Sequence, residues 1–562
     1  MTADEHFDSV VIGSGFGGSV AAYRLAEAGR SVLVLERGQP YPPGSFPRTP
    51  NDLRTSFWDP SKGLYGLFDL WWFDQLDAVV ASGLGGGSLI YANVMLRKDE
   101  RTFVHEELAD GGYESWPVTR AELEPHYDAV ERMQKPQRFP IDAGPPYSTT
   151  RKTRALLQAA STMRLPASTP PLAVLFAPGA GQRPVPGLPL SDGSANLHGA
   201  PRSTCRLCGE CDLGCNFGAK NTLDFTYLSR AMEASAQIRT CCEVGTISPA
   251  ERRGGYRVGY RQHFGARGGH PERLLDPTRE PQRTVTADQV VLAAGAVATP
   301  HLLLSNRAGL PRLSHALGSR VSGNGDYIGW IRDCRNPSGT GWRYLEPSRG
   351  PVITASIEVD EHSSPSGRGF LIQDAGAPNF ADWLWQSTEL PGDLIRMARP
   401  LRRLLRDRLR GRRDTEAAAV AAGLLGDAHA SAAMLPVLAM GRDVPNGRYR
   451  LQGKRLELDW RPELSDPYYD GLRERMRELA RSLGGRFMPN PLDRRGRSIS
   501  VHMVGGCPMG TSSREGVVDP WGRVFGHPGL WIADGSVMPG PVGVNPSFTI
   551  AALADRFADA ML

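Results

Sequence analysis

The first 36 residues constrain the fold more than any other part of the chain. An apolar run at 7–12 (FDSVVI) leads into the turn GSGFGG, an Ala-rich segment follows, and a second apolar run ends at Glu36. Glycines in such a turn let the backbone approach a pyrophosphate, and the N-terminus of the next helix stabilises the phosphate charge. An acid in the place of Glu36 accepts the hydroxyls of a ribose that carries no 2′-phosphate. The pattern therefore predicts a nucleotide-binding unit for FAD or NAD, built on Gly13, Ser14, Gly15, Phe16, Gly18 and Glu36.

A second glycine-rich segment, ASGLGGGSLIYANVML, follows an aromatic stretch. Its glycines and Ser88 can present a row of backbone N–H groups to a phosphate or to the edge of a flavin. A flexible loop without a ligand is the alternative interpretation. We expect Gly83, Gly87 and Ser88 to belong to the cofactor site.

Length and composition exclude several classes of protein. A chain of 562 residues with 40% apolar content, 64 Gly and 45 Pro is long enough for two globular, loop-rich domains. The net charge of +5 is modest, and no nucleic-acid-binding signature is present, so we expect no nucleic-acid partner. No basic and apolar leader precedes the first strand, and no run has the length of a membrane span. We expect a cytoplasmic protein.

Four segments spread along the chain resemble the glucose–methanol–choline (GMC) flavoprotein oxidoreductases, closest to their bacterial cholesterol oxidase branch. They are VVIGSGFGGSVAA with Glu36, GLGGGSL, AAGAVATPHLLLSN at 293–306, and HMVGGCPMG through ADGSVMPGPVGVNPSFTIAALADR. The resemblance implies FAD as cofactor and oxidation of an alcohol. It also implies an α/β fold: a Rossmann-type FAD-binding domain with a second, discontinuous α+β substrate-binding domain built on an antiparallel sheet.

The same resemblance divides the chain into interleaved parts. We expect residues 1–45, 76–125, 206–325 and 485–562 to form the FAD-binding domain. The substrate-binding domain then comprises 46–75, 126–205 and 326–484.

Two residues near the C-terminus are the predicted catalytic pair. A histidine and an asparagine beside a cofactor can remove a proton from an alcohol and hold the oxygen left behind. His502 is the predicted base, and Asn545 binds the substrate oxygen. The helix expected after Pro546 would direct its positive N-terminus at the flavin. The resemblance adds the cofactor contacts Asn93, Val244 at the adenine edge, Asp534, Gly535, Asn545 and Pro546.

Four cysteines form the pattern C-x2-C-x2-C-x3-C at Cys205, Cys208, Cys211 and Cys215. This spacing is typical of iron–sulfur clusters, although Asn216 stands where the ferredoxin pattern has Pro. Some GMC dehydrogenases that resemble this chain carry a small cluster in a comparable segment. An iron–sulfur cluster, a zinc knuckle, disulfides and inert thiols all stay open.

A basic segment at 396–413 holds nine arginines interleaved with leucines. Such a segment can lie on an anionic membrane, which would give peripheral contact with a lipid surface. A solvated helix face is the favoured interpretation, because Pro400 interrupts the pattern.

The resemblance points to a sterol or another bulky apolar alcohol as substrate, with O2 or another redox acceptor taking the electrons. Relatives that also isomerise the steroid double bond use a glutamate where GFLIQDAGAP has Gln373, and an amide cannot shuttle a proton. Glu358 is the alternative if this registration is wrong. A dehydrogenase that passes electrons through a cluster, and a flavin-binding relative without redox turnover, are the competing functions. Neither the substrate nor the oligomeric state follows from the sequence.

Overall fold

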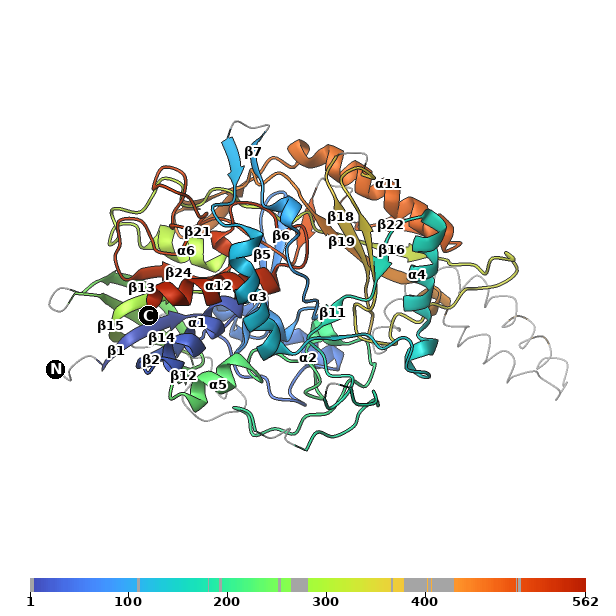
Figure 1. Cartoon of the computed structure of the whole chain (residues 1–562), viewed down its shortest axis with the longest axis horizontal. Helices are drawn as coiled ribbons and strands as arrows, with labels where there is room; N and C mark the ends of the chain where they lie inside the picture. The colour runs from blue at the N-terminus through green and yellow to red at the C-terminus, as the bar shows by residue number, and fades with distance from the viewer. Residues whose placement is uncertain are drawn as a thin grey trace.

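The computed structural model describes residues 5–108, 112–179, 181–191, 195–250, 254–263, 282–364, 367–378, 402, 406, 429–491, 493 and 497–562. The polypeptide forms two adjoining bodies, each built on a large β-sheet (Figure 1). Most of the basic segment 396–413 lies outside the described residues, so its predicted membrane contact stays a prediction.

The first body is built on a seven-stranded sheet. Its core is parallel, and an antiparallel hairpin extends one edge. In spatial order the strands are β12 (Gln237–Arg239), β2 (Val32–Leu35), β1 (Glu5–Ile12), β15 (Arg283–Leu292), β14 (Tyr256–Gln262) and β13 (Cys242–Pro249), with β24 (Leu530–Ile532) also paired to β15. This arrangement confirms the predicted Rossmann-type α/β domain.

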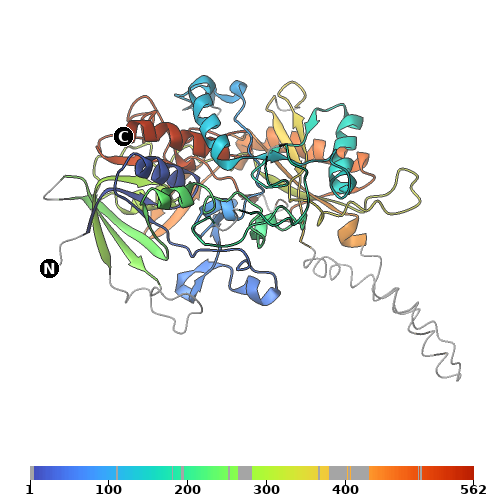
Figure 2. The same cartoon turned by 60° about the horizontal axis from the view of Figure 1, so that its bottom comes forward.

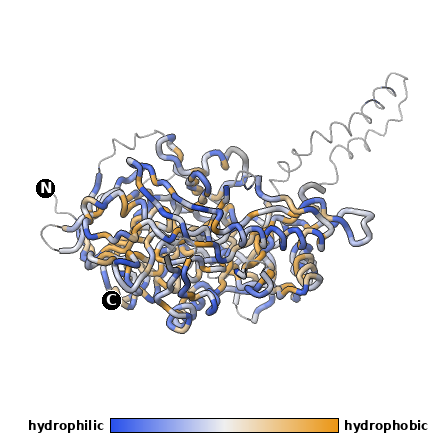
Figure 3. The backbone as a smooth tube through the Cα atoms, turned by 90° about the horizontal axis from the view of Figure 1, so that it is seen from above, coloured by the Kyte–Doolittle hydropathy of each residue, from blue (hydrophilic) through white to orange (hydrophobic). Residues whose placement is uncertain are grey.

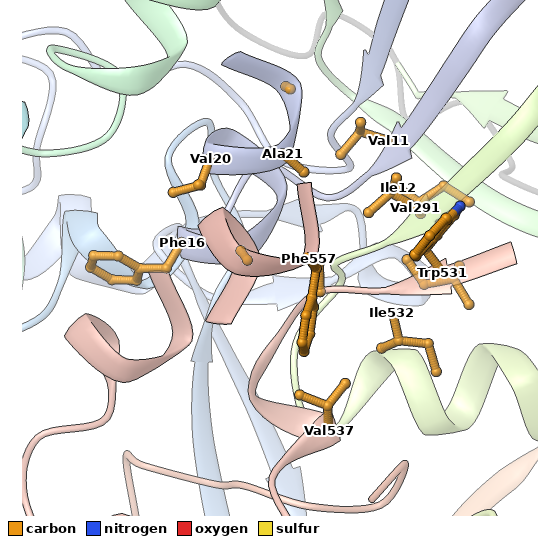
Figure 4. Packing of buried hydrophobic residues seen from close by; sticks show 14 of the residues in the cluster. Val11, Ile12, Phe16, Val20, Ala21, Val291, Trp531, Ile532, Val537 and Phe557 are labelled. Atoms are coloured by element: carbon orange, nitrogen blue, oxygen red, sulfur yellow. The ribbon is translucent and has the colours of Figure 1, made fainter. Parts of the chain in front are cut away.

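Burial on both faces explains why these strands are continuous apolar runs. The helices α1 (Phe16–Glu27) and α12 (Ser547–Met561) pack against each other over the parallel strands. Figure 4 shows Ala21 of α1, Phe557 of α12 and Ile532 of β24 in this shared core. The first and last segments of the chain therefore stabilise the same body.

The second body is built on a six-stranded antiparallel sheet, as predicted. Its order is β10 (Ala167–Ser168), β17 (Ser356–Val359), β18 (Phe370–Asp374), β19 (Leu435–Gly441), β16 (Tyr327–Arg332) and β22 (Arg486–Pro489). The helices α4 (Arg151–Met163) and α11 (Asp466–Ser482) share a buried apolar cluster with this sheet. Figure 2 shows the two sheets at opposite ends of the molecule.

A small three-stranded sheet, β23 (Ser498–Ser500), β6 (Leu76–Ala81) and β5 (Phe68–Trp72), leads the chain toward His502. The other named helices and strands are α2 (Pro50–Arg54), β3 (Trp58–Asp59), β4 (Leu64–Tyr65), β7 (His105–Leu108), β8 (Gly112–Ser115), α3 (Arg120–Gln134), β9 (Gln137–Arg138), β11 (Pro171–Leu172), α5 (Tyr227–Glu233), α6 (Ala298–Ser305), α10 (His429–Ala432), β20 (Arg448–Gln452) and β21 (Arg455–Asp459).

Three predicted domain boundaries divide units that the structure keeps together. The boundary at 75/76 falls in the turn of the β5–β6 hairpin, and the one at 125/126 falls inside α3. The boundary at 484/485 assigns β22 to the FAD-binding part, yet β22 pairs with β16 of the second sheet. A domain boundary does not divide a hydrogen-bonded hairpin, a helix or two paired strands. The division into two domains stays a prediction, and these three boundaries do not coincide with the limits of the structural units.

Apolar segments are distributed through both bodies rather than gathered in one long stretch (Figure 3). Across the described ranges, no helix combines the length and apolar character needed to cross a bilayer.

Candidate active site

The site begins where the parallel strands of the first sheet end. Ile12 lies opposite Leu35 on β2 and Leu292 on β15, and Leu292 lies opposite Ile532 on β24. A cavity of about 1410 Å³ opens at these carboxyl ends and reaches the second sheet. Ligands of open α/β sheets bind at this edge, and small-ligand pockets measure roughly 300–1,000 Å³. The cavity therefore has room for a dinucleotide and a substrate together.

The Glu36 carboxylate connects the glycine-rich turn after β1 to the end of β2 through hydrogen bonds. Its Oε2 accepts hydrogen bonds from the backbone N–H and the hydroxyl of Ser14, at 3.0 and 2.6 Å, and its Oε1 accepts from Gly38 N–H at 2.8 Å. The Ser14 hydroxyl also accepts from Gly85 N–H at 3.0 Å, which joins the two glycine-rich segments. A carboxylate has about four acceptor positions, so Glu36 keeps one for a ribose hydroxyl.

Three glycines leave space that a ligand would fill. A Cβ added to Gly15, Gly87 or Gly295 would meet no protein atom within 4 Å, and all three residues line the cavity. Gly15 is also the N-cap of α1 and provides no side-chain cap. The first N–H groups of α1 are therefore available to a phosphate. These features fit the pyrophosphate and flavin of FAD.

Most of the predicted cofactor residues line the cavity. They are Gly13, Ser14, Gly15, Phe16, Glu36, Gly87, Val244, Asp534, Gly535, Asn545 and Pro546. Gly18, Gly83, Ser88 and Asn93 lie behind its wall.

These residues behind the wall shape the backbone. A Cβ at Gly18 would lie 2.1 Å from the Gly13 carbonyl oxygen, so glycine permits close packing of α1 on the turn. The Ser88 hydroxyl donates to the Gly85 carbonyl and accepts from Leu223 N–H. Asn93 adopts a left-handed φ of 70°.

His502 lines the cavity, and its ring is held by a buried carboxylate. His502 Nδ1 lies 2.7 Å from Asp326 Oδ1. The other oxygen, Oδ2, accepts from Val501 N–H at 2.9 Å and from the Ser500 hydroxyl at 3.2 Å. A neutral imidazole in this arrangement donates its Nδ1 proton to Asp326 and keeps the Nε2 lone pair free. His502 Nε2 is therefore able to accept a proton.

Asn545 is buried beside the same cavity and pairs with Gln373 of β18. Gln373 Nε2 donates to Asn545 Oδ1 at 3.0 Å, and Asn545 Nδ2 donates to Gln373 Oε1 at 3.3 Å. The reciprocal pair fixes the Asn545 amide and uses one of its two N–H donors. The second N–H is available to a substrate oxygen.

One turn connects the supports of both predicted catalytic residues. Asn324 accepts from the N–H groups of Val542 and Gly543, at 2.8 and 3.1 Å, and donates to the Val544 carbonyl at 2.9 Å. Two residues further on, Asp326 holds His502. The turn that precedes β16 therefore positions both His502 and the loop that carries Asn545.

The Asp443 carboxylate holds the start of this turn, at Ser322 and Gly323, in place. The carboxylate accepts from the Ser322 hydroxyl at 2.5 Å and from Gly323 N–H at 3.1 Å. Burial raises the pKa of Asp443 to about 7, although these hydrogen bonds oppose the rise.

The loop before α12 and the end of β24 complete the wall. Asp534 Oδ2 accepts from Gly295 N–H at 2.8 Å and from the Thr299 hydroxyl at 2.5 Å. Asp534 thereby ties the ends of β15 and β24 together. The helix expected after Pro546 is α12, whose N-cap Pro546 provides no side-chain cap. Its N-terminal N–H groups face the cavity that Pro546 and Ser547 line.

The four cysteines of the C-x2-C-x2-C-x3-C segment are free thiols in the structure. All four cysteines are described, and in the described part of the chain no group of three or more His, Cys, Asp or Glu side chains is placed to hold a metal ion. Cys205 packs in an apolar cluster, and burial raises its pKa well above the ordinary value. Burial likewise raises the pKa of Cys208 to about 12. The predicted iron–sulfur cluster therefore finds no support among the described residues.

Sequence reasoning missed Asp326, Asn324 and the pairing of Gln373 with Asn545. Asp326 lies 176 residues before His502, and its segment carries no local pattern that indicates a catalytic partner. Glu358, the alternative isomerisation residue, lines a separate cavity of about 490 Å³ and forms an ion pair with Arg101 at 3.3 Å.

Comparison with known families adds independent information. Family models described as GMC oxidoreductase match residues 190–323 and 476–554. A third, described as an NAD(P)-binding Rossmann-like domain, matches residues 11–42.

Curated relatives match nearly the whole chain. A cholesterol oxidase of Mycobacterium tuberculosis is 31% identical over 98% of this chain and 90% of its own length. A cholesterol oxidase of Acinetobacter baumannii is 28% identical over 99% of this chain and 94% of its own length. Among solved structures, pyridoxine 4-oxidase from Mesorbium loti has a TM-score of 0.53 and 17% identity, with 98% of both chains covered. The last likeness concerns the fold alone.

Proposed function

Because this chain belongs to the GMC oxidoreductase family, we propose that it oxidises an alcohol to a ketone or aldehyde with FAD as cofactor. The cavity at the strand ends, the uncapped N-terminus of α1 and the free acceptor position of Glu36 support FAD as the resident cofactor. When bound, FAD would accept the hydride from the carbinol carbon.

The observation that carries the proposal is the contact of His502, which lines this cavity, with the buried Asp326 behind it. His502 Nε2 takes the hydroxyl proton while the hydride leaves the carbinol carbon, so the alcohol loses two electrons and two hydrogens. Asp326 accepts the Nδ1 proton and stabilises the imidazolium that forms. A base in this position typically contributes about 10²–10⁴-fold in rate.

Asn545 orients the reacting oxygen. Gln373 fixes the Asn545 amide, and the remaining N–H donates to the substrate oxygen. The N-terminus of α12 adds partial positive charge at the same end of the cavity. That charge favours a negatively charged reduced cofactor.

The substrate half of the cavity supports a bulky apolar alcohol, such as a sterol. Apolar side chains of the second sheet and its neighbouring loop form this wall: Ile328, Trp330, Ile353, Val437 and Leu438. Two relatives of the chain are cholesterol oxidases, which supports a sterol as substrate and O2 as the acceptor.

Oxidation without isomerisation is part of this proposal. The Gln373 amide is engaged with Asn545 and cannot act as a proton shuttle. Glu358 lies in the separate cavity beside Arg101.

Anaerobic mixing of the FAD-loaded protein with 3-hydroxysteroids and simple aliphatic alcohols tests the proposal. We expect the flavin absorbance to bleach with a bulky apolar alcohol, and to bleach about 10²-fold more slowly in His502→Gln. If no alcohol of the panel bleaches the flavin, the protein is a non-redox flavin-binding relative and the proposal fails.

A further inference from the structure

A buried lysine outside the cavity supports the loop that carries Asn545. The Lys98 side chain is fully buried, and its Nζ donates to the carbonyl oxygens of Pro541 and Val542, at 3.0 and 3.3 Å. Both residues are buried, and in the described part of the chain no backbone N–H donates to either carbonyl. A buried carbonyl without a donor is costly, so Lys98 fixes the conformation of this stretch.

The backbone of Lys98 is held by α3 and, through it, by α12. The Lys98 carbonyl accepts from Arg120 Nη1 at 2.7 Å, and Lys98 N–H donates to the Tyr127 hydroxyl at 3.2 Å. Both partners lie on α3, and the Tyr127 hydroxyl is hydrogen-bonded to Thr549 of α12 at 2.8 Å. The ammonium group also lies over the Trp116 ring, with 4.2 Å between Nζ and the ring centroid. Lys98 therefore connects the loop to the helices of the first body.

A glycine separates this contact from Asn545. Gly543 has a φ of 83°, in the left-handed region that glycine adopts at little cost. On the other side of the loop, Asn324 accepts from the N–H groups of Val542 and Gly543. The N–H of Val542 is thus held by Asn324, and its carbonyl is held by Lys98. The direction in which the chain continues from Gly543 to Asn545 depends on both contacts.

Lys98 is not required to compensate the buried carboxylate beside this loop. A Cβ added to Gly540 would lie 2.5 Å from Glu114 Oε1, so Glu114 packs against the loop. The Glu114 carboxylate already has Arg442 Nη2 at 3.6 Å. Lys98 forms no ion pair with any described residue, and its Nζ donates only to the two loop carbonyls. A buried ammonium group is costly unless its donors are used, and here the loop uses them.

We infer that Lys98 is a positioning residue of the proposed oxidation, which holds the loop so that the Asn545 amide meets the substrate oxygen. The inference rests on the proposed role of Asn545. Lys98 does not line the cavity, so it acts through the loop and not on the substrate. A misplacement of about 1 Å can reduce a rate about 10²-fold. We therefore expect loss of the Lys98 contacts to slow anaerobic flavin reduction about 10-fold or more.

The first test measures recognition of the substrate oxygen without turnover. Two steroids are compared, one with a 3-keto group and one without oxygen at that carbon, and binding of each to the FAD-loaded protein is followed by the perturbation of the flavin spectrum. The affinity ratio of the ketone to the deoxy compound reports the hydrogen bond from Asn545. It is measured for the wild type, Lys98→Met, Asn545→Ala and the double variant.

Tyr256→Phe is the matched control. The buried Tyr256 hydroxyl also donates to a loop carbonyl, that of Pro528 at 2.9 Å, but neither residue lines the cavity. Its loss therefore removes a comparable hydrogen bond at a distance from Asn545.

We expect the wild type and Tyr256→Phe to bind the ketone about 10-fold tighter than the deoxy compound. The ratio falls to about threefold or less in Lys98→Met, and the double variant shows no loss beyond that of Asn545→Ala. An unchanged ratio in Lys98→Met overturns the inference. So does an equal loss in Tyr256→Phe, or equal binding of both compounds by the wild type.

A second measurement distinguishes failure of the inference from failure of the proposed function. The anaerobic rate of flavin reduction by the matching 3-hydroxysteroid is compared between the wild type and Lys98→Met. If the alcohol does not reduce the flavin but the ketone preference depends on Lys98, the oxidation fails and the positioning role stands. If both proteins reduce the flavin at the same rate and keep the same ketone preference, the oxidation stands and the inference fails.

Lys98→Gln keeps the test decisive if Lys98→Met does not fold. Its amide still donates to one of the two carbonyls, so we expect a ketone preference between those of the wild type and Asn545→Ala. A preference equal to that of the wild type overturns the inference.

Discussion

Gln373 and Asn545 exchange two hydrogen bonds, at 3.0 and 3.3 Å, across the junction between the second sheet and the loop that precedes α12. One residue comes from β18 and the other from the loop that the Asn324 turn holds. The orientation of the Asn545 amide therefore depends on contacts from both bodies of the protein.

Replacement of Gln373 by Leu tests this dependence. Leucine removes both hydrogen bonds and leaves the buried Asn545 amide free to rotate, so we expect kcat to fall about 10-fold. Asn545→Ala should cost more, because the donor to the substrate oxygen is lost outright. Steady-state kinetics of the wild type, the two single variants and the double variant give a double-mutant cycle. If Gln373→Leu costs the same in the Asn545→Ala background as in the wild type, Gln373 does not act through Asn545.

The contact of Asp326 with His502 makes a second prediction. Asp326→Asn can present an N–H to Nδ1 and thereby favour the tautomer that protonates Nε2, which is unable to accept a proton. We expect the anaerobic rate of flavin reduction to fall by about 10²–10⁴-fold, with substrate binding changed much less.

Asp443→Asn provides the comparison for Asp326→Asn. Asp443 lies in the same turn network but contacts Ser322 and Gly323 rather than the imidazole. Its substitution should change the reduction rate less than 10-fold. Equal losses in both variants would mean that Asp326 acts through the turn and not through the base.

The sequence predicts the first sheet well because its signals are local. The turn from Gly13 to Gly18, the acid at Glu36 and the helix after Pro546 each lie within one short segment, and the structure places them as expected. Asp326 and Gln373 could not be predicted in the same way. Their roles arise from contacts across more than 170 residues, and neither residue carries a local pattern.

The cysteine segment shows the limit of a strong local pattern. The spacing leaves several kinds of site open, and the structure adds only tertiary contacts: Cys205 joins an apolar cluster, and Lys220 Nζ donates to the carbonyl oxygens of Cys211 and Leu89. The boundary at 484/485 could not be placed from a local signal either, because β22 joins the second sheet through its pairing with β16.

Lys152 and Asp374 form a fully buried ion pair at 2.9 Å, and Lys152 also donates to the carbonyl oxygens of Pro351 and Val352. Lys152→Met keeps the side-chain length but leaves the Asp374 charge uncompensated. We expect it to lower the free energy of unfolding by about 3–5 kcal/mol, measured by urea denaturation with FAD held constant. A loss below about 1 kcal/mol would contradict a structural role for this pair.

The ion pair of Arg101 and Asp99 lies on the surface and serves as the comparison for the buried pair of Lys152 and Asp374. Arg101 and Asp99 form an ion pair at 2.6 Å between exposed side chains, so Arg101→Met should cost no more than about 1 kcal/mol in the same denaturation assay.

Asp443 makes the free energy of unfolding depend on pH, and its raised pKa sets the direction of that dependence. Burial raises the folded-state pKa of Asp443 to about 7, from an ordinary value of 3.8, so between these pH values the folded protein binds the proton that the unfolded chain has released. The stabilising contribution is complete below the unfolded pKa and is lost as pH rises through 7. Relative to Asp443→Asn, which does not titrate, the wild type should lose stability between pH 4 and 7.5, by roughly 4 kcal/mol at most. Urea unfolding of both proteins across this range measures the difference, in which contributions from all other titrating groups cancel. A difference that stays constant with pH, or one that grows in favour of the wild type, would show that Asp443 is ionised in the folded protein throughout.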